Sequence, residues 1–200
     1  PAVTITMNGS IKHKSKKNLA NEGNLIYLSK PLGTGYLLAA YFQNSQLLSI
    51  NDFEKLLKYL KTSNDSAAKS GFSNGSQLMT DISGFGLASH LGDICQSSNL
   101  SANIHLNKDM LINDKIEIIN KYESSGYKNN QLTSYGSIDI RDDHPLLKII
   151  FDPQTNGPLL IAIDKNKKNE FEKEFIKNCH SQPLLIGEFI EQKEKLIYFK

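Results

Sequence analysis

The sequence predicts an α+β fold in which a mixed or antiparallel sheet is flanked by helices. Short apolar stretches that suit buried strands interleave with helical patterns along the 200 residues, without the strict alternation that a parallel sheet needs. The last two apolar stretches, residues 183–190 and 195–200, follow each other with no helical pattern between them. We therefore expect them to pair as a hairpin, within one domain because no repeat or linker divides the chain.

The first part of the chain begins with residues 1–24, which are polar, lack periodicity and are expected to form a flexible lead-in. Its basic cluster, residues 12–17, is more typical of a solvated segment than of a phosphate or nucleic-acid contact. Residues 24–30 predict a buried strand that Pro31 ends, whereas residues 36–42 suit either a helix or a strand. Asp52 can then cap a helix whose apolar face carries Phe53, Leu56, Leu57 and Leu60.

The middle of the chain alternates between strand and helix patterns. Residues 70–76 predict a loop and residues 77–82 a short strand, followed by a helix with an apolar stripe made of Leu87, Leu91, Ile94 and Cys95. Residues 102–106 alternate like a strand, and a helix through Ile112, Ile116 and Ile119 follows. Because residues 123–145 are rich in Ser, Gly, Asn and Asp, we expect a long loop there.

The last part contains a short apolar helix before residue 151, a turn-rich loop and a strand over residues 159–163. Asp164 is expected to begin a helix that buries Phe171 and Phe175.

Composition excludes several classes of function. The chain has 23 basic and 21 acidic residues, and Arg141 is its only arginine, which argues against nucleic-acid binding. No apolar run reaches the roughly 20 residues that a membrane span needs, and no segment has the layout of a secretory signal. Cys95 and Cys179 lack metal-ligand spacing. We expect both to be free thiols that fill apolar space on helices, in the cytoplasm.

Asp81 carries the chemically most suggestive pattern. It ends a predicted strand, and Gly84 and Gly86 follow it before a helix begins. The free N–H groups at a helix N-terminus suit a phosphate, and a neighbouring carboxylate suits Mg²⁺, which binds one or two carboxylates together with phosphate oxygens. The alternative is that Asp81 or Ser83 only caps the helix.

Two further glycine-bearing stretches leave the same choice open. KPLGTG, residues 30–35, resembles a phosphate loop but lacks the spacing GxxxxGK[ST], which favours the alternative of a plain Pro-Gly turn between buried elements. In FDPQTNGPLL, residues 151–160, Gln154, Thr155 and Asn156 could bind a ligand or satisfy a turn. The five histidines show neither HxxH nor HExxH spacing, and no nucleophile motif is present. We therefore assign no catalytic residue.

Taken together, the stretches LSKPLGTGYLLAA, MTDISGFGLASHL and FDPQTNGPLLIAI resemble selenide, water dikinase (selenophosphate synthetase). They occur in the order and approximate spacing of the C-terminal half of that family, from about Val3 to the end of the chain. The family belongs to a superfamily with aminoimidazole ribonucleotide synthetase, in which an N-terminal α/β half and a C-terminal α+β half bind ATP between or beside them. The resemblance implies that residues 1–200 are a single C-terminal domain of a longer enzyme, resembling that of the synthetase.

The resemblance also implies a reaction and its partners. The family makes selenophosphate from selenide, ATP and water, with AMP and phosphate as co-products. Its reactive Cys or selenocysteine and partner Lys belong to the N-terminal half, so the isolated chain is expected to be inactive. The implied partners are that half, ATP and selenide, with no nucleic acid and no membrane. A full-length homodimer is expected, and a fusion to a flavin-type oxidoreductase domain occurs in such synthetases.

The resemblance assigns roles to particular residues. Asp81 matches a magnesium ligand of the family. By position in the motifs, the residues expected near ATP are Gly84, Gly86, Gln154, Thr155 and Gly157. His90 matches a family histidine to which we assign no role.

The sequence departs from the family pattern in two places. Ser83 replaces a Thr, and Asn156-Gly157-Pro158 replaces Ser-Gly-Gly, so the backbone N–H at Pro158 is lost. These changes leave two alternatives open: a non-catalytic binding or assembly domain of the same fold, or another ATP-dependent member of the superfamily.

Overall fold

A seven-stranded mixed sheet organises the chain, and the computed structural model describes residues 6, 8–10, 15–16, 18–113 and 116–200. The strand order is β2-β5-β1-β6-β3-β7-β4. All neighbours pair antiparallel except β7, which runs parallel to β3 and to β4. The strands are β1 (Leu25–Leu28), β2 (Met79–Asp81), β3 (Leu100–Ile104), β4 (Ile138–Asp139), β5 (Leu159–Ile163), β6 (Leu184–Glu191) and β7 (Ile197–Phe199). The expected α+β fold with a mixed sheet is confirmed.

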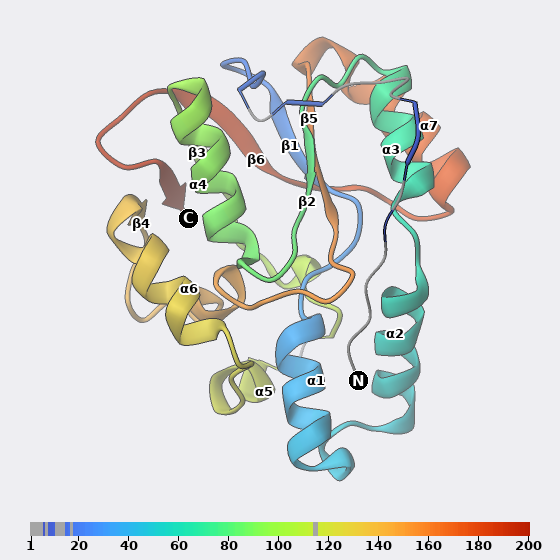
Figure 1. Cartoon of the computed structure of the whole chain (residues 1–200), viewed down its shortest axis with the longest axis vertical. Helices are drawn as coiled ribbons and strands as arrows, with labels where there is room; N and C mark the ends of the chain where they lie inside the picture. The colour runs from blue at the N-terminus through green and yellow to red at the C-terminus, as the bar shows by residue number, and fades with distance from the viewer. Residues whose placement is uncertain (1–5, 7, 11–14, 17, 114–115) are drawn as a thin grey trace.

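Helices cover both faces of this sheet and extend beyond one end (Figure 1). α3 and α7 lie side by side on one face, α4 lies on the other, and α1, α2 and α5 lie at the end where β1 finishes. The helices are α1 (Thr34–Gln43), α2 (Ile50–Lys61), α3 (Asp65–Ser73), α4 (Gly86–Ser98), α5 (Ile116–Lys121), α6 (Tyr127–Ser134) and α7 (Lys168–Cys179). Within the described ranges, no helix is both long enough and apolar enough to span a membrane.

The core has two apolar layers that share the sheet. Because successive side chains of a strand point to opposite faces, β1 contributes Ile26 to the larger layer and Tyr27 to the smaller one. In the smaller layer Phe171 and Phe175 of α7 are fully buried, as the sequence predicts, and Phe171 packs against Tyr27 with ring centroids 4.9 Å apart. Cys95 is buried on α4 and Cys179 half-buried at the end of α7, both as free thiols, as expected.

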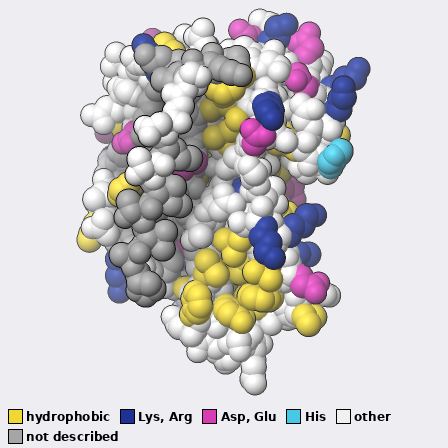
Figure 2. Space-filling model, turned by 45° about the vertical axis from the view of Figure 1, so that its right-hand side comes forward, with side chains coloured by type: hydrophobic (Ala, Val, Ile, Leu, Met, Phe, Trp, Pro, Cys, Tyr) yellow, Lys and Arg dark blue, Asp and Glu magenta, His cyan; other side chains and the backbone are white. Residues whose placement is uncertain are grey.

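The side of the molecule that carries α2 also exposes apolar groups. Figure 2 shows hydrophobic side chains gathered in the lower half of this side, beside several basic side chains. Phe42 at the end of α1 and Ile50 at the start of α2 are 79% and 76% exposed.

The predicted C-terminal hairpin is wrong. β3 lies between β6 and β7, pairing antiparallel with β6 and parallel with β7. The Ser101 side chain fixes the connection, because Ser101 Oγ accepts from Lys193 N and donates to Lys195 O. Two strands that are adjacent in sequence are therefore separated by a third strand in space.

The predicted loop over residues 123–145 is also wrong, because it contains α6 and β4. The buried residues of α6 are Tyr127, Asn130 and Ser134, two of which are polar. A helix that buries polar side chains gives no apolar stripe, so hydrophobic periodicity cannot reveal it.

Several element boundaries also differ from expectation. Ser49, not Asp52, caps α2, and Asp52 completes a capping box as the third residue of the helix. Residues 70–73 belong to α3 rather than to a loop. Residues 36–42, for which the sequence leaves helix and strand open, lie within the helix α1. Ile112 precedes α5, which begins only at Ile116.

The expected flexible lead-in lies partly outside the described residues, as does most of the basic cluster. Of that cluster, Ser15 and Lys16 are described: Ser15 hydrogen-bonds to Met79, the first residue of β2, and Lys16 to Gln77 just before the strand.

Candidate functional site

The three glycine-bearing motifs meet at one end of the sheet. Because β5 runs antiparallel to both β1 and β2, the C-terminal ends of β1 and β2 and the N-terminal end of β5 lie together. Residues 30–35 follow β1, residues 82–86 follow β2 and residues 151–158 precede β5. We call this meeting point the motif junction.

Within the junction, the FDPQT segment caps the N-terminus of α1. Gly33 N and Thr34 N donate to Gln154 Oε1 at 2.8 and 3.2 Å, and Tyr36 N donates to Asp152 Oδ2 at 3.1 Å. Gly35 N also donates to the Asp152 carboxylate. The four N–H groups that start this helix are thereby satisfied by two side chains, so KPLGTG forms a capped helix start and not a vacant phosphate loop.

Gly35 is required here by close approach of the chain, because a Cβ at this position would lie 2.1 Å from Pro153 O.

Asp152 is the charged centre of this cap. It is 3% exposed, and Ser124 Oγ and Gln154 Nε2 donate to it at 2.7 and 2.9 Å. Burial raises the pKa of Asp152 to about 6, although the hydrogen bonds from Ser124, Tyr36, Gln154 and Gly35 oppose that rise. At pH 7 the carboxylate form therefore prevails and serves as the acceptor for α1.

The segment after β2 packs against the same loop. Ile82 N donates to Pro158 O at 2.8 Å, and Gln154 N donates to Ser83 O at 2.9 Å. A Cβ on Gly157 would lie 2.1 Å from Ile82 O, so only glycine fits this contact. Pro158, which departs from the family pattern, is buried and still provides its carbonyl as an acceptor.

His90 of α4 holds the turn that follows β2. The ring is 8% exposed, and its Nε2 lies 3.3 Å from both the backbone N and the Oγ of Ser83. The backbone N–H can only donate, so Nε2 acts as the acceptor of that bond. His90 therefore fixes the turn from inside.

Asp81 and Gly84 face outward from the junction. Asp81 ends β2 and is exposed, and Gly84 is exposed, with no atom of the described residues within 4 Å of a Cβ placed on it. Across the described part of the chain, no group of three His, Cys, Asp or Glu residues could hold a metal ion. A single exposed carboxylate such as that of Asp81 could supply only one ligand of a Mg²⁺ ion, so its role as a metal ligand stays a prediction.

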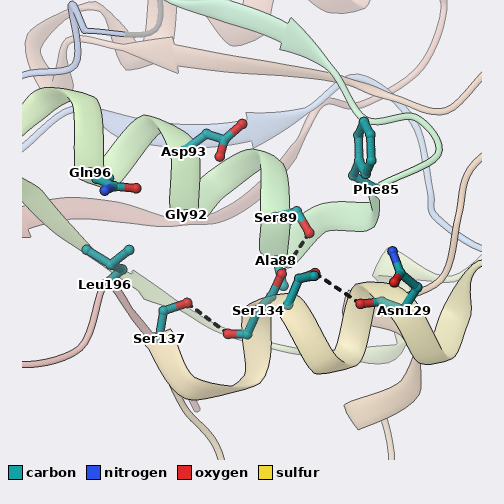
Figure 3. A pocket seen from close by; sticks show the side chains of 11 residues that line it. Phe85, Ala88, Ser89, Gly92, Asp93, Gln96, Asn129, Ser134, Ser137 and Leu196 are labelled. Atoms are coloured by element: carbon teal, nitrogen blue, oxygen red, sulfur yellow. Dashed lines mark hydrogen bonds between the residues drawn. The ribbon is translucent and has the colours of Figure 1, made fainter.

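A groove runs along α4 from this turn. Its volume is about 440 Å³, and it lies between α4 and α6, which Ser89 Oγ and Ser134 Oγ join at 2.7 Å (Figure 3). Phe85, the residue between the two motif glycines, stands at one end of the groove and is 64% exposed. Asp93 and Gln96 of α4 line the groove further along the helix.

The comparison with known families identifies the fold of the chain. The family described as "AIR synthase related protein, C-terminal domain" matches residues 21–199. The chain belongs to this family. The resemblance seen in the three motifs is thereby confirmed at the level of the domain.

Relatives of this AIR synthase-related domain include two selenide, water dikinases. The protein from Shewanella sp. (strain MR-4) is 29% identical over 92% of this chain and 52% of its own length. The protein from Photorhabdus laumondii subsp. laumondii is 31% identical over 96% of this chain and 54% of its own length. The chain thus spans about half the length of the curated relatives it matches.

Solved structures share the fold of the domain. Thiamine-monophosphate kinase from Stenotrophomonas maltophilia K279a superposes with a TM-score of 0.63 and 14% identity, over 93% of this chain and 52% of that protein. The hydrogenase maturation protein HypE, solved in complex with ATP, gives a TM-score of 0.57 and 13% identity, over 92% of this chain and 49% of that protein.

The predicted site residues of the AIR synthase-related domain divide into two groups. Asp81, Gly84 and Thr155 are exposed, and Thr155 N donates to Thr34 Oγ1 at 2.9 Å. Gly86, Gln154 and Gly157 are buried in the junction. Whether any of the six contacts ATP or a metal stays a prediction.

Sequence reasoning did not select two residues of the junction. Asn130 of α6 is 2% exposed, and its Nδ2 donates to Gly84 O and Phe151 O, both at 2.9 Å. Ser124 donates to Asp152. Both lie in the segment expected to be a loop, and no periodic signal marks them. The only indication of a partner such as Ser124 is that the Asp152 carboxyl is buried and therefore needs hydrogen-bond donors.

Proposed function

We propose that this chain is the C-terminal part of a selenide, water dikinase, which makes selenophosphate from selenide, ATP and water and releases AMP and phosphate. The matches over more than nine-tenths of this chain to proteins of that name support the proposal. An ATP-bound structure of the same fold supports nucleotide binding. One observation carries the site assignment: Asp81 is exposed beside the open turn at Gly84, whereas the neighbouring motif residues Gln154 and Gly157 are buried.

The role proposed for Asp81 is to donate one carboxylate oxygen to Mg²⁺ at the end of β2. Mg²⁺ bound there would neutralise charge on the ATP phosphates. The exposed turn at Gly84 and Phe85, held by His90 and Asn130, would let the phosphates approach the start of α4. Gly86, Gln154, Thr155 and Gly157 would keep this turn in place.

The remaining machinery is proposed to lie outside this chain, in an N-terminal half that supplies the nucleophile and most ATP ligands. Residues 1–200 would then be a single domain of a longer protein, inactive alone and dimeric when full-length. The free thiols Cys95 and Cys179 support a reducing compartment such as the cytoplasm.

The test is Asp81→Asn in the full-length protein, assayed for selenide-dependent formation of AMP. Loss of an outer partner of a metal ligand typically costs about 10–100-fold, so loss of a direct ligand should lower kcat about 100-fold or more. Circular dichroism should be unchanged because the side chain is exposed. The matched control is Asp139→Asn, an exposed aspartate at the end of β4, which should keep full activity.

Undiminished turnover in Asp81→Asn would remove this residue from the site. Selenide-dependent AMP formation by residues 1–200 alone would contradict the proposed division between two halves. A full-length protein that phosphorylates another acceptor, or none, would instead favour another superfamily member or a non-catalytic domain.

A further inference from the structure

A second cavity lies at the same end of the sheet, beside the last residues of β1. Its volume is about 270 Å³, and it is enclosed by Ser29 and Lys30, the end of α2, the start of α3 and the end of α7. Cavities that take drug-sized ligands measure roughly 300–1,000 Å³, so this one suits a smaller molecule.

Lys30 brings a buried positive charge to the wall of this cavity. Its side chain is 5% exposed, and its Nζ donates to Thr62 O at 2.8 Å and to Tyr59 O at 3.3 Å. Burial lowers the pKa of Lys30 to about 8, so the ammonium form prevails at pH 7.

The two hydrogen bonds that Lys30 makes among the described residues leave one N–H donor of its ammonium group free and part of its positive charge unneutralised. An ammonium group has three donors, and the two carbonyls at the end of α2 take two of them. The end of a helix carries about half a negative charge, which cannot neutralise a full positive one. The ion pairs found among the described residues involve other lysines and Arg141, not Lys30.

The rest of the cavity wall also favours negative charge. Among the described residues, no Asp or Glu lines the cavity, whereas Lys58 and His180 do. The start of α3 also forms part of the wall, and its cap residue Asn64 makes no capping hydrogen bond. The Asn64 side chain instead bonds to Ser29 Oγ and Gly157 O. Ser63 Oγ accepts from Asp65 N at 3.1 Å, and among the described residues no other side chain caps the first-turn amides of α3.

We propose that this cavity binds a small oxyanion of the phosphate class, between the Lys30 ammonium and the first turn of α3. An oxyanion would supply the missing negative charge and accept from hydroxyl and amide donors of the wall, which include Ser63 and Ser66. The site is separate from Asp81, because β5 lies between β2 and β1. It does not depend on the proposed function.

The test is a titration of the ¹⁵N-labelled 200-residue chain at pH 7 with inorganic phosphate, sulfate or ATP without metal, and with NaCl at matched ionic strength. We expect saturable shifts of the backbone amides of residues 63–67 with phosphate and sulfate, and none with NaCl. A stronger response to ATP than to phosphate would identify a phosphate ester as the natural ligand. An equal or weaker one would identify the free ion.

Lys30→Met should weaken phosphate binding about tenfold or more, and Lys58→Met, at an exposed position of the wall, about threefold. The matched control is Lys55→Met, exposed on α2 outside the cavity, which should stay within about twofold. If Lys30→Met does not fold, the amide shifts of the unaltered chain and the Lys58→Met affinity decide. The proposal is overturned if these amides do not respond, if NaCl gives the same shifts, or if Lys58→Met and a folded Lys30→Met both bind phosphate unchanged.

Discussion

Asp152 and Gln154 do for α1 what a bound phosphate does for other helices: they place oxygen acceptors at its first four N–H groups. The Asp152 carboxylate is almost fully buried in this position and remains an acceptor at pH 7 because its folded-state pKa is about 6. That value lies above the roughly 3.9 of an unfolded aspartate. The group therefore links the stability of the motif junction to pH.

The sign of this link is opposite to that of a salt-bridged aspartate. Between about pH 4 and pH 6, folded Asp152 holds a proton that the unfolded chain has already lost. Its contribution to the free energy of unfolding therefore falls as pH rises through this window, by on the order of 3 kcal/mol in total. Urea unfolding at pH 4, 5, 6 and 7 should show this decline as a difference between the unaltered protein and Asp152→Asn.

Asp152→Asn should also be less stable at pH 7 by about 1–3 kcal/mol, because an amide NH₂ would face N–H and O–H donors. Identical pH slopes in the two proteins, or a carboxyl resonance of Asp152 that titrates near pH 4, would disprove the raised pKa.

At the scale of the elements, the junction holds three segments together by backbone contacts that tolerate no side chain. The loop before β5 touches both the start of α1, at Gly35, and the segment after β2, at Gly157. This loop also reaches α2, because Asn156 Nδ2 donates to Leu60 O and Thr62 O at 2.8 and 3.1 Å. The departure from the family pattern at Asn156 thus has a structural use as a cap at the end of α2.

Gly157→Ala should destabilise the protein, because the new Cβ would lie 2.1 Å from Ile82 O and the two segments would have to separate. Overpacking of this kind costs about 1–3 kcal/mol. Gly92→Ala is the matched control: it lies within α4 with no atom near a new Cβ, so it should stabilise the protein by up to about 1 kcal/mol. Thermal unfolding of both variants provides the comparison, and equal melting temperatures would contradict it.

The elements that the sequence predicts well are those with a regular apolar pattern. The stripe of α4, the buried phenylalanines of α7 and the strand over residues 159–163 all have such a pattern, and all are confirmed. The pattern fails for α6, which buries Asn130 and Ser134, and for the C-terminal hairpin, because the place of β3 depends on tertiary pairing.

The candidate site was predictable only in part, because its contacts also depend on tertiary pairing. Glycines and polar side chains mark the three motifs, but the sequence leaves open whether Gln154 binds a ligand or the chain itself. Its hydrogen bonds to Gly33 and Thr34 span about 120 positions, and no local pattern encodes them.

At the scale of the whole molecule, the two apolar layers are joined through shared strands. Leu25 and Tyr27 of β1 belong to the smaller layer, and Ile26 and Leu28 belong to the larger one. Displacing β1 would therefore disrupt both layers at once. We therefore expect a single cooperative unfolding transition.

Phe171→Ala in the smaller layer and Leu91→Ala in the larger one should each lower the free energy of unfolding, by about 3–5 and 2–5 kcal/mol. Both should shift the same urea transition, seen by circular dichroism and by tyrosine fluorescence, without changing its slope. Leu132→Ala, 83% exposed on α6, is the control and should stay within about 0.5 kcal/mol. Two separate transitions in Phe171→Ala would show that the layers unfold independently.

The parallel strand β7 is formed by Ile197–Phe199, almost the last residues of the chain, yet it lies between β3 and β4. During synthesis β4 therefore has no neighbour in the described sheet until residues 197–199 have been added, and β3 has only β6. A nascent chain can assemble β2, β5, β1, β6 and β3 beforehand, but the sheet is complete only once β7 is available. Any product that ends before Ile197 would expose an open strand edge to chaperones, proteases or other copies of itself.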